Sequence, residues 1–517
     1  MNIIQNHIHM DRIKCRAVSQ STLEDDINLP ETSPDMSKII FREGNVLISE
    51  TKVTKDHVAI TGILELFLLY LTEEEEEKLA RAVGKIPFEE NVYVEGAEPG
   101  DMFDVTWNIE DLSVSTVNSR KISARSILTF QLQAECLYDE EAAVDLEDGK
   151  DVEYHLEQME VARLAICKKD IFRIRQDFEL PSHMPNIYRL IWQSAKVSAL
   201  QFKPLDDKIA VSGEVSVFLL YESPQEDDNI QYYETMLPVT GTIDCVGSRE
   251  MMIPDITWNM TGRECEVRPD MDGEERGCAL ELVLDLGIKM YAEETVSILS
   301  DVYGIRHDIE STVKDGSFRR ILVKNSGTCR LSEKLTTEGN PQILQLVHSE
   351  GEVLTRECTA TDDGIQIEGT LCVKCLYVTS DDKMPYASLE QTLPFAYLLE
   401  AKGMQKDADL NVHVGMEQLS VSMLDATELE AKISLDISCI VFEEFHQELL
   451  TQLSVMPPDK NARRSIPGIV VHVTEPGETL WQIGKRYYQP VAAIRELNGI
   501  SGDTIRPGEK LILVKGR

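Results

Sequence analysis

The sequence predicts a mainly β protein, built from three repeated all-β units of sandwich or barrel type and a small β-α-α-β domain at the C-terminus. Two observations carry this prediction. Strand-like segments recur three times with the same landmarks, and the stretch from Ile469 onward places helix-start and helix-stop signals between two short strand patterns. The length of 517 residues and the apolar content of 42% suit three or four folded domains rather than a disordered chain.

The repeat is marked by a glycine, a tyrosine eight residues later and a proline 17 residues after the tyrosine. The three glycine-to-tyrosine segments are Gly62–Tyr70, Gly213–Tyr221 and Gly369–Tyr377. The three prolines are Pro87, Pro238 and Pro394. The first and third copies also share Leu-Ser-Val-Ser 25 residues after the proline, whereas the second copy is looser there, around Cys265. Because the glycines lie 151 and 156 residues apart, the sequence indicates a unit of that size in three copies.

Each copy alternates apolar and polar residues around its glycine, as in V-A-I-T-G-I-L-E-L-F, which is typical of a strand with one buried face. The glycine inside each strand predicts a bulge or a bend. Acidic segments between tyrosine and proline, such as Glu73–Glu77, predict long hairpin connections. A solvated loop is the plain interpretation of their charge, and a patch facing cations or a partner is the alternative. Stretches near residues 136–168 and 295–325 are expected to connect the units.

These landmarks divide the chain into five parts. The predicted boundaries are residues 1–150, 165–300 and 320–450 for the three β-units, 455–468 for a tether and 469–517 for the C-terminal domain. The tether prediction depends on Pro457-Pro458 and on the basic residues that follow, because such a composition is typical of linkers.

The C-terminal domain has clear element boundaries. Ile469–Val473 and Lys510–Val514 read as strands. Thr479 with Gln482 three residues later has the spacing of a capping box, which starts a first helix. Pro490 suits the first turn of a second helix, and Asn498-Gly499 suits its end, because both residues tolerate the left-handed cap.

This stretch resembles a LysM domain through the motifs P-G-E-T-L-W, L-N-G and I-R-P-G-E-K-L. In that family, ligands lie in a shallow groove between the turn into the first helix and the loop before the last strand. The resemblance implies N-acetylglucosamine polymers, such as peptidoglycan or chitin-like glycans, as one class of ligand. The partner-binding or ligand-binding residues that we expect are Ile469, Glu478, Thr479, Leu480, Trp481, Lys485, Ile500 and Arg506.

Two features of this domain leave its ligand open. Trp481 lies one place off the apolar stripe of its helix, so it either flanks the groove or stabilises a small domain. The first strand is apolar on both sides, with Ile469, Val471 and Val473 on one side and Val470 on the other. Because helices cover one face of a β-α-α-β unit, part of this strand is expected to remain exposed as an adhesive surface.

Charge and cysteine usage suggest the compartment and exclude some partners. The net charge is −39, and the first 465 residues alone carry −41. That field argues against binding nucleic acid or anionic lipid through the β-units, although solubility alone explains a charge of this kind. Eleven scattered cysteines predict reduced thiols. The first 25 residues contain no apolar signal region, and the longest apolar run, Leu66–Leu71, is too short to span a bilayer. We therefore expect a cytoplasmic protein.

No motif predicts catalysis, a metal or a cofactor. Cys372 and Cys375 form a C-x-x-C pair, but residues three apart on a strand point to opposite faces, so their sulfurs cannot converge on one metal. Phosphate-binding loops, dinucleotide-binding glycines and nucleophile elbows are absent from the sequence. The expectation is a protein that is not an enzyme.

Three such units followed by one LysM domain resemble the SipL-like family of spore-coat morphogenetic proteins, whose repeats are SPOCS domains. The resemblance implies a non-enzymatic structural adaptor in spore coat assembly. It also implies a place in the mother-cell cytoplasm at the forespore surface, and contact between the LysM domain and the coat morphogenetic ATPase SpoIVA, with other coat proteins as further partners. The alternative is a protein that binds peptidoglycan or N-acetylglucosamine through its LysM domain. An enzyme with an unrecognised site among the repeats is the remote third reading.

Overall fold

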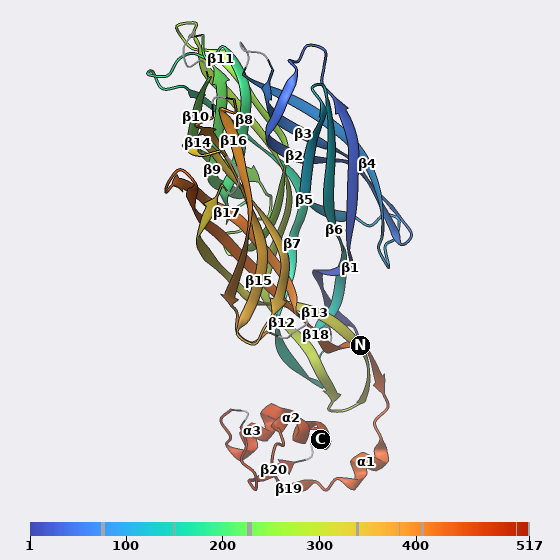
Figure 1. Cartoon of the computed structure of the whole chain (residues 1–517). Helices are drawn as coiled ribbons and strands as arrows, with labels where there is room; N and C mark the ends of the chain where they lie inside the picture. The colour runs from blue at the N-terminus through green and yellow to red at the C-terminus, as the bar shows by residue number, and fades with distance from the viewer. Residues whose placement is uncertain are drawn as a thin grey trace.

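The computed structural model of the chain shows three β-sandwich units side by side and a small C-terminal domain at one end (Figure 1). It describes residues 1–73, 78–147, 149, 151–224, 230–337, 341–381, 383–404, 408–502 and 504–514. The acidic runs predicted as hairpin loops lie largely outside these residues. No helix in the described part of the chain has the length and apolar character that crossing a bilayer requires.

Within the described residues, each unit contains six strands in two three-stranded antiparallel sheets. The strands of the first unit are β1 (Ile3–Asn28), β2 (Met36–Thr54), β3 (His57–Thr72), β4 (Leu79–Tyr93), β5 (Phe103–Asn118) and β6 (Lys121–Leu146). Those of the second are β7 (Val152–Glu179), β8 (Arg189–Leu205), β9 (Lys208–Glu222), β10 (Ile230–Asp244), β11 (Ile253–Pro269) and β12 (Glu275–Gly304). Those of the third are β13 (Asp308–Thr336), β14 (Ile343–Ala360), β15 (Gly364–Thr379), β16 (Tyr386–Glu400), β17 (Asp409–Met423) and β18 (Glu428–Met456).

The two sheets have the same strand order in every unit. One sheet is β2-β3-β4 in the first unit, β8-β9-β10 in the second and β14-β15-β16 in the third. The other is β1-β6-β5, β7-β12-β11 and β13-β18-β17. Apolar side chains from both sheets fill each sandwich, and Leu64 and Leu66 of β3 pack with Leu128 and Phe130 of β6 in the first unit. The predicted all-β architecture and its triplication are confirmed.

The repeated segment forms the central strand of its sheet, β3, β9 or β15. Its final residues are continuously apolar because both faces are covered there. Tyr70 faces the sandwich core, whereas Leu69 and Leu71 belong to a second cluster, which contains residues of all three units. In the first two units the tyrosine hydroxyl is satisfied inside the core, since Tyr70 donates to the Pro34 carbonyl at 3.1 Å and Tyr221 donates to the Pro185 carbonyl at 3.1 Å. In the third unit, the buried Tyr377 hydroxyl has no hydrogen-bond partner among the described residues.

The segments expected to be connectors are strands, so that prediction was wrong. β6 and β7 run through most of residues 136–168, and β12 and β13 run through most of residues 295–325. Six strands, β1, β6, β7, β12, β13 and β18, are much longer than the others. The N-terminal halves of β1, β7 and β13 and the C-terminal halves of β6, β12 and β18, here called the far halves, pack together in one cluster. Each unit contributes to it, for example through Met10, Val161 or Phe318. Each far half buries one side against the other units and exposes charged residues on the other, and those charges concealed the strand pattern.

The units are consequently longer than the predicted boundaries. The second unit begins at Val152 rather than near 165, and the third begins at Asp308 rather than near 320. In the predicted tether, β18 ends at Met456 and a short helix, α1 (Lys460–Ser465), follows.

The C-terminal domain is a two-stranded antiparallel ribbon covered on one face by two helices. Its elements are β19 (Ile469–Val473), α2 (Leu480–Tyr487), α3 (Val491–Asn498) and β20 (Lys510–Val514). Leu480, Ile483 and Ile494 of the helices pack on Leu511 and Leu513 of the ribbon. The Thr479–Gln482 capping box and the left-handed Gly499 cap are present, which confirms the predicted β-α-α-β order.

Candidate partner-binding site

The eight residues predicted to bind a ligand do not form one site. Three of them are structural. Thr479 caps α2, and Leu480 is buried in the domain core. The Glu478 carboxylate accepts a hydrogen bond from His472 Nε2 at 2.7 Å and pairs with Arg486 at 3.0 Å. Although burial raises the pKa of Glu478, the hydrogen bonds from His472 and from the Glu475 N–H outweigh it and hold that pKa below its usual range. Glu478 therefore ties the turn to β19.

Ile500 and Arg506 lie in the loop between α3 and β20, and they differ from each other in burial. Ile500 packs against the domain core. The Arg506 side chain is exposed, and the backbone N–H of Arg506 donates to the Glu509 carboxylate at 3.0 Å. This loop is the far wall of the expected groove, and its backbone is held in place by local hydrogen bonds.

Ile469 belongs to an exposed apolar face of the ribbon. In this face, Ile469 pairs with Val514 and Val471 pairs with Ile512, and Val473 extends the row. These five side chains are between 44% and 68% exposed. Val470 points the other way, into the core. The predicted exposure of this strand is thus confirmed, and residues of β20 extend the exposed apolar face. We call these five residues the ribbon face.

Trp481 and Lys485 point away from the ribbon face, toward the second β-unit. The Trp481 indole N–H donates to Asp301 Oδ2 at 2.8 Å, and Lys485 Nζ donates to both Asp301 oxygens, at 2.7 and 2.8 Å. The Trp481 ring lies edge-on to Tyr303, with centroids 4.7 Å apart, and 5.2 Å from the His155 ring. These two predicted binding residues therefore contact the end of β12 and the start of β7.

The contact extends along α2 and into the predicted tether. The Tyr303 hydroxyl donates to the Gln489 carbonyl at 2.7 Å. Arg463 of α1 donates to the Ile305 carbonyl at 2.6 Å and pairs with Asp308 at 2.9 Å. Arg463 also lies 4.1 Å from the centre of the Tyr488 ring. The segment predicted to be a tether holds the domain against the junction of the second and third units.

Asp301 and Tyr303 were missed by the sequence reasoning, because they lie in the stretch expected to be a connector. Their one signal is spacing, since an acid and a tyrosine two residues apart on a strand share a face.

The comparisons with known proteins follow the same division of the chain. A family model described as the SipL SPOCS domain matches residues 35–117, 186–268 and 342–424. A LysM domain model matches residues 472–514. The chain has the SipL-like architecture. Searches of the curated proteins and of the solved structures found no match.

Each SPOCS match covers four strands, which are β2–β5, β8–β11 or β14–β17. The long strands β1, β6, β7, β12, β13 and β18 lie outside the matches. These six strands form one of the shared clusters that join the units, and Asp301 and Tyr303 lie near the end of β12, one of the six. The LysM domain therefore contacts the strands that lie between SPOCS domains rather than the SPOCS folds themselves.

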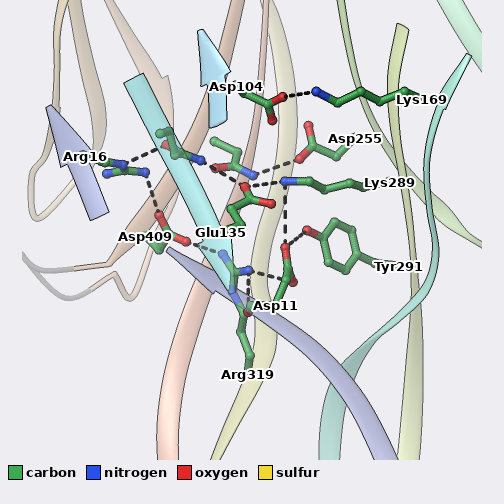
Figure 2. A network of polar contacts seen from close by, with 12 residues as sticks. Asp11, Arg16, Asp104, Glu135, Lys169, Asp255, Lys289, Tyr291, Arg319 and Asp409 are labelled. Carbon is green, nitrogen blue, oxygen red and sulfur yellow. Dashed lines mark hydrogen bonds and ion pairs between the residues drawn. The ribbon is translucent and has the colours of Figure 1, made fainter. Parts of the chain in front are cut away.

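A charged network lies where the three units meet (Figure 2). Asp11 of β1 accepts hydrogen bonds from Arg319 of β13 at 3.0 Å and from Tyr291 of β12 at 2.7 Å. Arg319 also pairs with Asp409, and Lys289 pairs with Glu135. Asp11 is 1% exposed and Tyr291 is fully buried. Because Asp11, Tyr291 and Arg319 belong to different units, the network joins the units.

The cysteine pair occupies ordinary strand positions, as expected. Cys375 is buried in the core of the third unit, and Cys372 lies beside Glu390. Burial raises the pKa of each thiol to about 12, which keeps both protonated and unreactive near neutral pH. Among the described residues, no group of three or more His, Cys, Asp or Glu side chains is arranged to hold a metal ion.

Proposed function

We propose that this protein is a non-enzymatic structural adaptor in spore coat assembly, acting in the mother-cell cytoplasm at the forespore surface. Its LysM domain docks onto the coat morphogenetic ATPase SpoIVA, and its SPOCS units serve as the assembly scaffold. The SPOCS and LysM matches support a sporulation-related adaptor. The observation that carries the proposal is the exposed ribbon face on the LysM domain.

The ribbon face has the properties of a protein-binding surface. Its five apolar side chains are contiguous across two paired strands, and Leu497 of α3, 48% exposed, is a further apolar residue on the domain surface. Contiguous exposed apolar surface of this kind marks interaction sites in soluble domains. The helices of the domain lie between the ribbon and the sandwiches, so the ribbon face points away from the rest of the chain (Figure 1). A partner can therefore cover it without moving the scaffold.

The charge distribution supports protein binding at this end of the molecule. The first 465 residues carry −41, whereas the residues from Ile466 onward carry +2. An apolar face on the part of the chain that carries little net charge can bind a partner without placing that partner against the strongly acidic β-units.

The test is a charge placed at the centre of the ribbon face. Val471→Lys in the full chain should weaken binding to purified SpoIVA at least tenfold, because it places a hydrated ammonium in an apolar contact. The melting temperature should be unchanged, since Val471 is already exposed. Val313→Lys is the matched control, because Val313 of β13 is also a strand valine that is half-exposed. Wild-type affinity in Val471→Lys would contradict the proposal.

The LysM match itself supports a second candidate function, glycan binding. The two are separated by titrating the full chain with chitin oligomers and peptidoglycan fragments. Micromolar binding to glycans, unaffected by Val471→Lys and without affinity for SpoIVA, would favour the second candidate.

A further inference from the structure

Two side chains of helix α2 in the LysM domain donate hydrogen bonds to one carboxylate of the same chain, that of Asp301. Trp481 and Lys485 are four residues apart and so lie on one face of α2. Between them they give Asp301 three hydrogen bonds of 2.7 to 2.8 Å, which reach both of its oxygens. Although burial raises the pKa of Asp301, the hydrogen bonds from Lys485 and Trp481 outweigh it and hold that pKa below its usual range. The face thus selects an ionised acid.

The same face also holds an aromatic ring. A Cβ atom at Gly484 would lie 2.5 Å from the Tyr303 hydroxyl and 2.8 Å from the Gln489 carbonyl oxygen, so the glycine leaves the space that the phenol occupies. The phenol fills that space edge-on to Trp481 and donates to the Gln489 carbonyl. Tyr303 is 4% exposed as a result. The acid and the ring are presented together because Asp301 and Tyr303 share one face of β12.

From these contacts we infer that the α2 face is a peptide-recognition site for an extended segment with the pattern Asp-x-Tyr. The chain's own Asp301-Val302-Tyr303 occupies this site until a partner segment with the same two groups displaces it. The inference deepens the proposed function, on which it rests, by adding a second contact to the ribbon face.

Displacement of Asp301 is feasible because its ion pair with Lys485 is weak. Asp301 and Lys485 keep 33% and 50% of their side-chain exposure, and ion pairs that are solvated to this degree contribute little to stability. Arg463 and α1 remain attached to Ile305 and Asp308 when α2 is released, so the domain stays close to the units. A partner segment therefore competes with a tethered internal ligand whose ion pair is weak.

The test uses the full chain and the pentapeptide Ser-Asp-Val-Tyr-Gly, which has the sequence of residues 300–304. Asp301→Lys removes the internal carboxylate and repels Lys485. The peptide should bind this variant at least tenfold more tightly than it binds the wild-type chain, and Ser-Asn-Val-Phe-Gly should bind neither. Adding Lys485→Glu to Asp301→Lys should abolish peptide binding. Asp285→Lys, on an exposed position of the same strand, is the control that should behave as wild type.

Hydrogen exchange provides a readout that does not depend on the peptide. The amides of residues 480–489 should exchange faster in Asp301→Lys than in the wild type, while those of β19 and β20 should not. Equal peptide affinity for both proteins, or unchanged exchange in α2, would overturn the inference. Because Val471→Lys tests only the ribbon face, loss of SpoIVA binding in that variant would leave the proposed function standing even if the α2 site failed.

Discussion

At the scale of single residues, the most informative position is one where the three units meet. Phe41, Trp192 and His348 are equivalent, since each pairs with the leucine that precedes the repeat tyrosine. Two units thus place an aromatic residue here and the third places a histidine. His348 is 5% exposed and stacks on Phe218 with centroids 4.0 Å apart. Neither ring nitrogen has a hydrogen-bond partner among the described residues.

The environment of His348 disfavours its charged form. Burial is the main cause, and the nearby Lys196 charge adds to it, so the pKa of His348 falls to about 3 from an ordinary value of 6.5. An unfolded chain takes up a proton at this residue below pH 6.5, whereas the folded protein does not. The unfolded state therefore binds more protons in this window, and the free energy of unfolding decreases as the pH falls from 6.5 toward 3.

Replacing this histidine by the residue of the first unit should remove the effect. His348→Phe should raise the free energy of unfolding by about 1–3 kcal/mol at pH 7, because it removes two buried nitrogens without partners. Its advantage over the wild type should grow by up to about 1.4 kcal/mol for each pH unit below 6.5. Urea denaturation at several pH values measures both. His446→Phe, at an exposed histidine, is the control. If the free energy of unfolding depended on pH with the same slope in His348→Phe and in the wild type, the prediction would be contradicted.

A second residue, Arg263, departs from the repeat because it forms a contact between units. The position 25 residues after the repeat proline is Leu112, Arg263 or Leu419. Leu112 and Leu419 lie near Gly44 and Gly351 inside their own units. Arg263 instead reaches the first unit and pairs with the buried Glu43 at 3.0 Å. The looser second copy therefore marks an inter-unit ion pair. The sequence contained this signal, but only the structure shows where the arginine goes.

At the scale of elements, the repeat glycine is explained by the strand beside it. Gly62, Gly213 and Gly369 each lie opposite a break in the register of the preceding strand, which is a β-bulge. In the third unit, a Cβ atom at Gly369 would lie 2.6 Å from the Phe395 ring and 2.7 Å from the Leu354 carbonyl oxygen. Phe395 directly follows the repeat proline, Pro394. The repeat glycine and the residue after the repeat proline therefore lie in close contact across two strands. A bulge is present at each glycine, but it lies in the neighbouring strand rather than in the glycine's own strand, where the sequence predicts it.

The close contact at Gly369 predicts that adding one methyl group there will destabilise the protein. Gly369→Ala should lower the free energy of unfolding by about 1–3 kcal/mol, because backbone and a buried ring must move to admit the Cβ atom. Gly415→Ala, in β17 of the same unit, should change it little, since nothing lies within 4 Å of that position. Thermal or urea denaturation measures both variants. Equal stabilities would show that the strand relaxes freely around the new methyl group.

At the scale of the whole molecule, the charged network and the six long strands make the three units one body. Arg319 is 5% exposed and links Asp11 of the first unit to Asp409 of the third. Tyr291 and Lys289 bring in the second unit, with the Lys289 ammonium 3.9 Å from Asp11. Since the network spans all three units, we expect them to unfold in one cooperative transition.

Removing the central arginine tests this coupling. Arg319→Met should lower the free energy of unfolding by about 3–5 kcal/mol, because it leaves the buried Asp11 carboxylate without its main partner. The neighbouring Arg320 is half-exposed and pairs with Glu443 at 2.7 Å, so Arg320→Met should cost less than about 1 kcal/mol. Calorimetry gives both the stability and the number of transitions. Two or more separate transitions in the wild type would show that the units fold independently.

What could be predicted from the sequence was local. The β-α-α-β order of the LysM domain, its capping box and its glycine cap depend on residues a few positions apart, and such interactions leave a readable pattern. The triplication was also readable, because each unit repeats the same glycine, tyrosine and proline to build the same bulge and core. The exposure of one face of β19 followed from its being apolar on both sides.

The tertiary structure alone decided which surfaces meet. The long strands beyond the SPOCS matches look like charged connectors in sequence, because only one of their sides is buried and the partners that bury it lie in other units. Trp481 and Lys485 were predicted to bind a ligand, but their contact with Asp301 joins positions 180 and 184 residues apart. Local patterns specify elements through short-range hydrogen bonds and burial. Contacts between distant elements depend on how complete sheets and helices pack, and no short stretch of sequence encodes that.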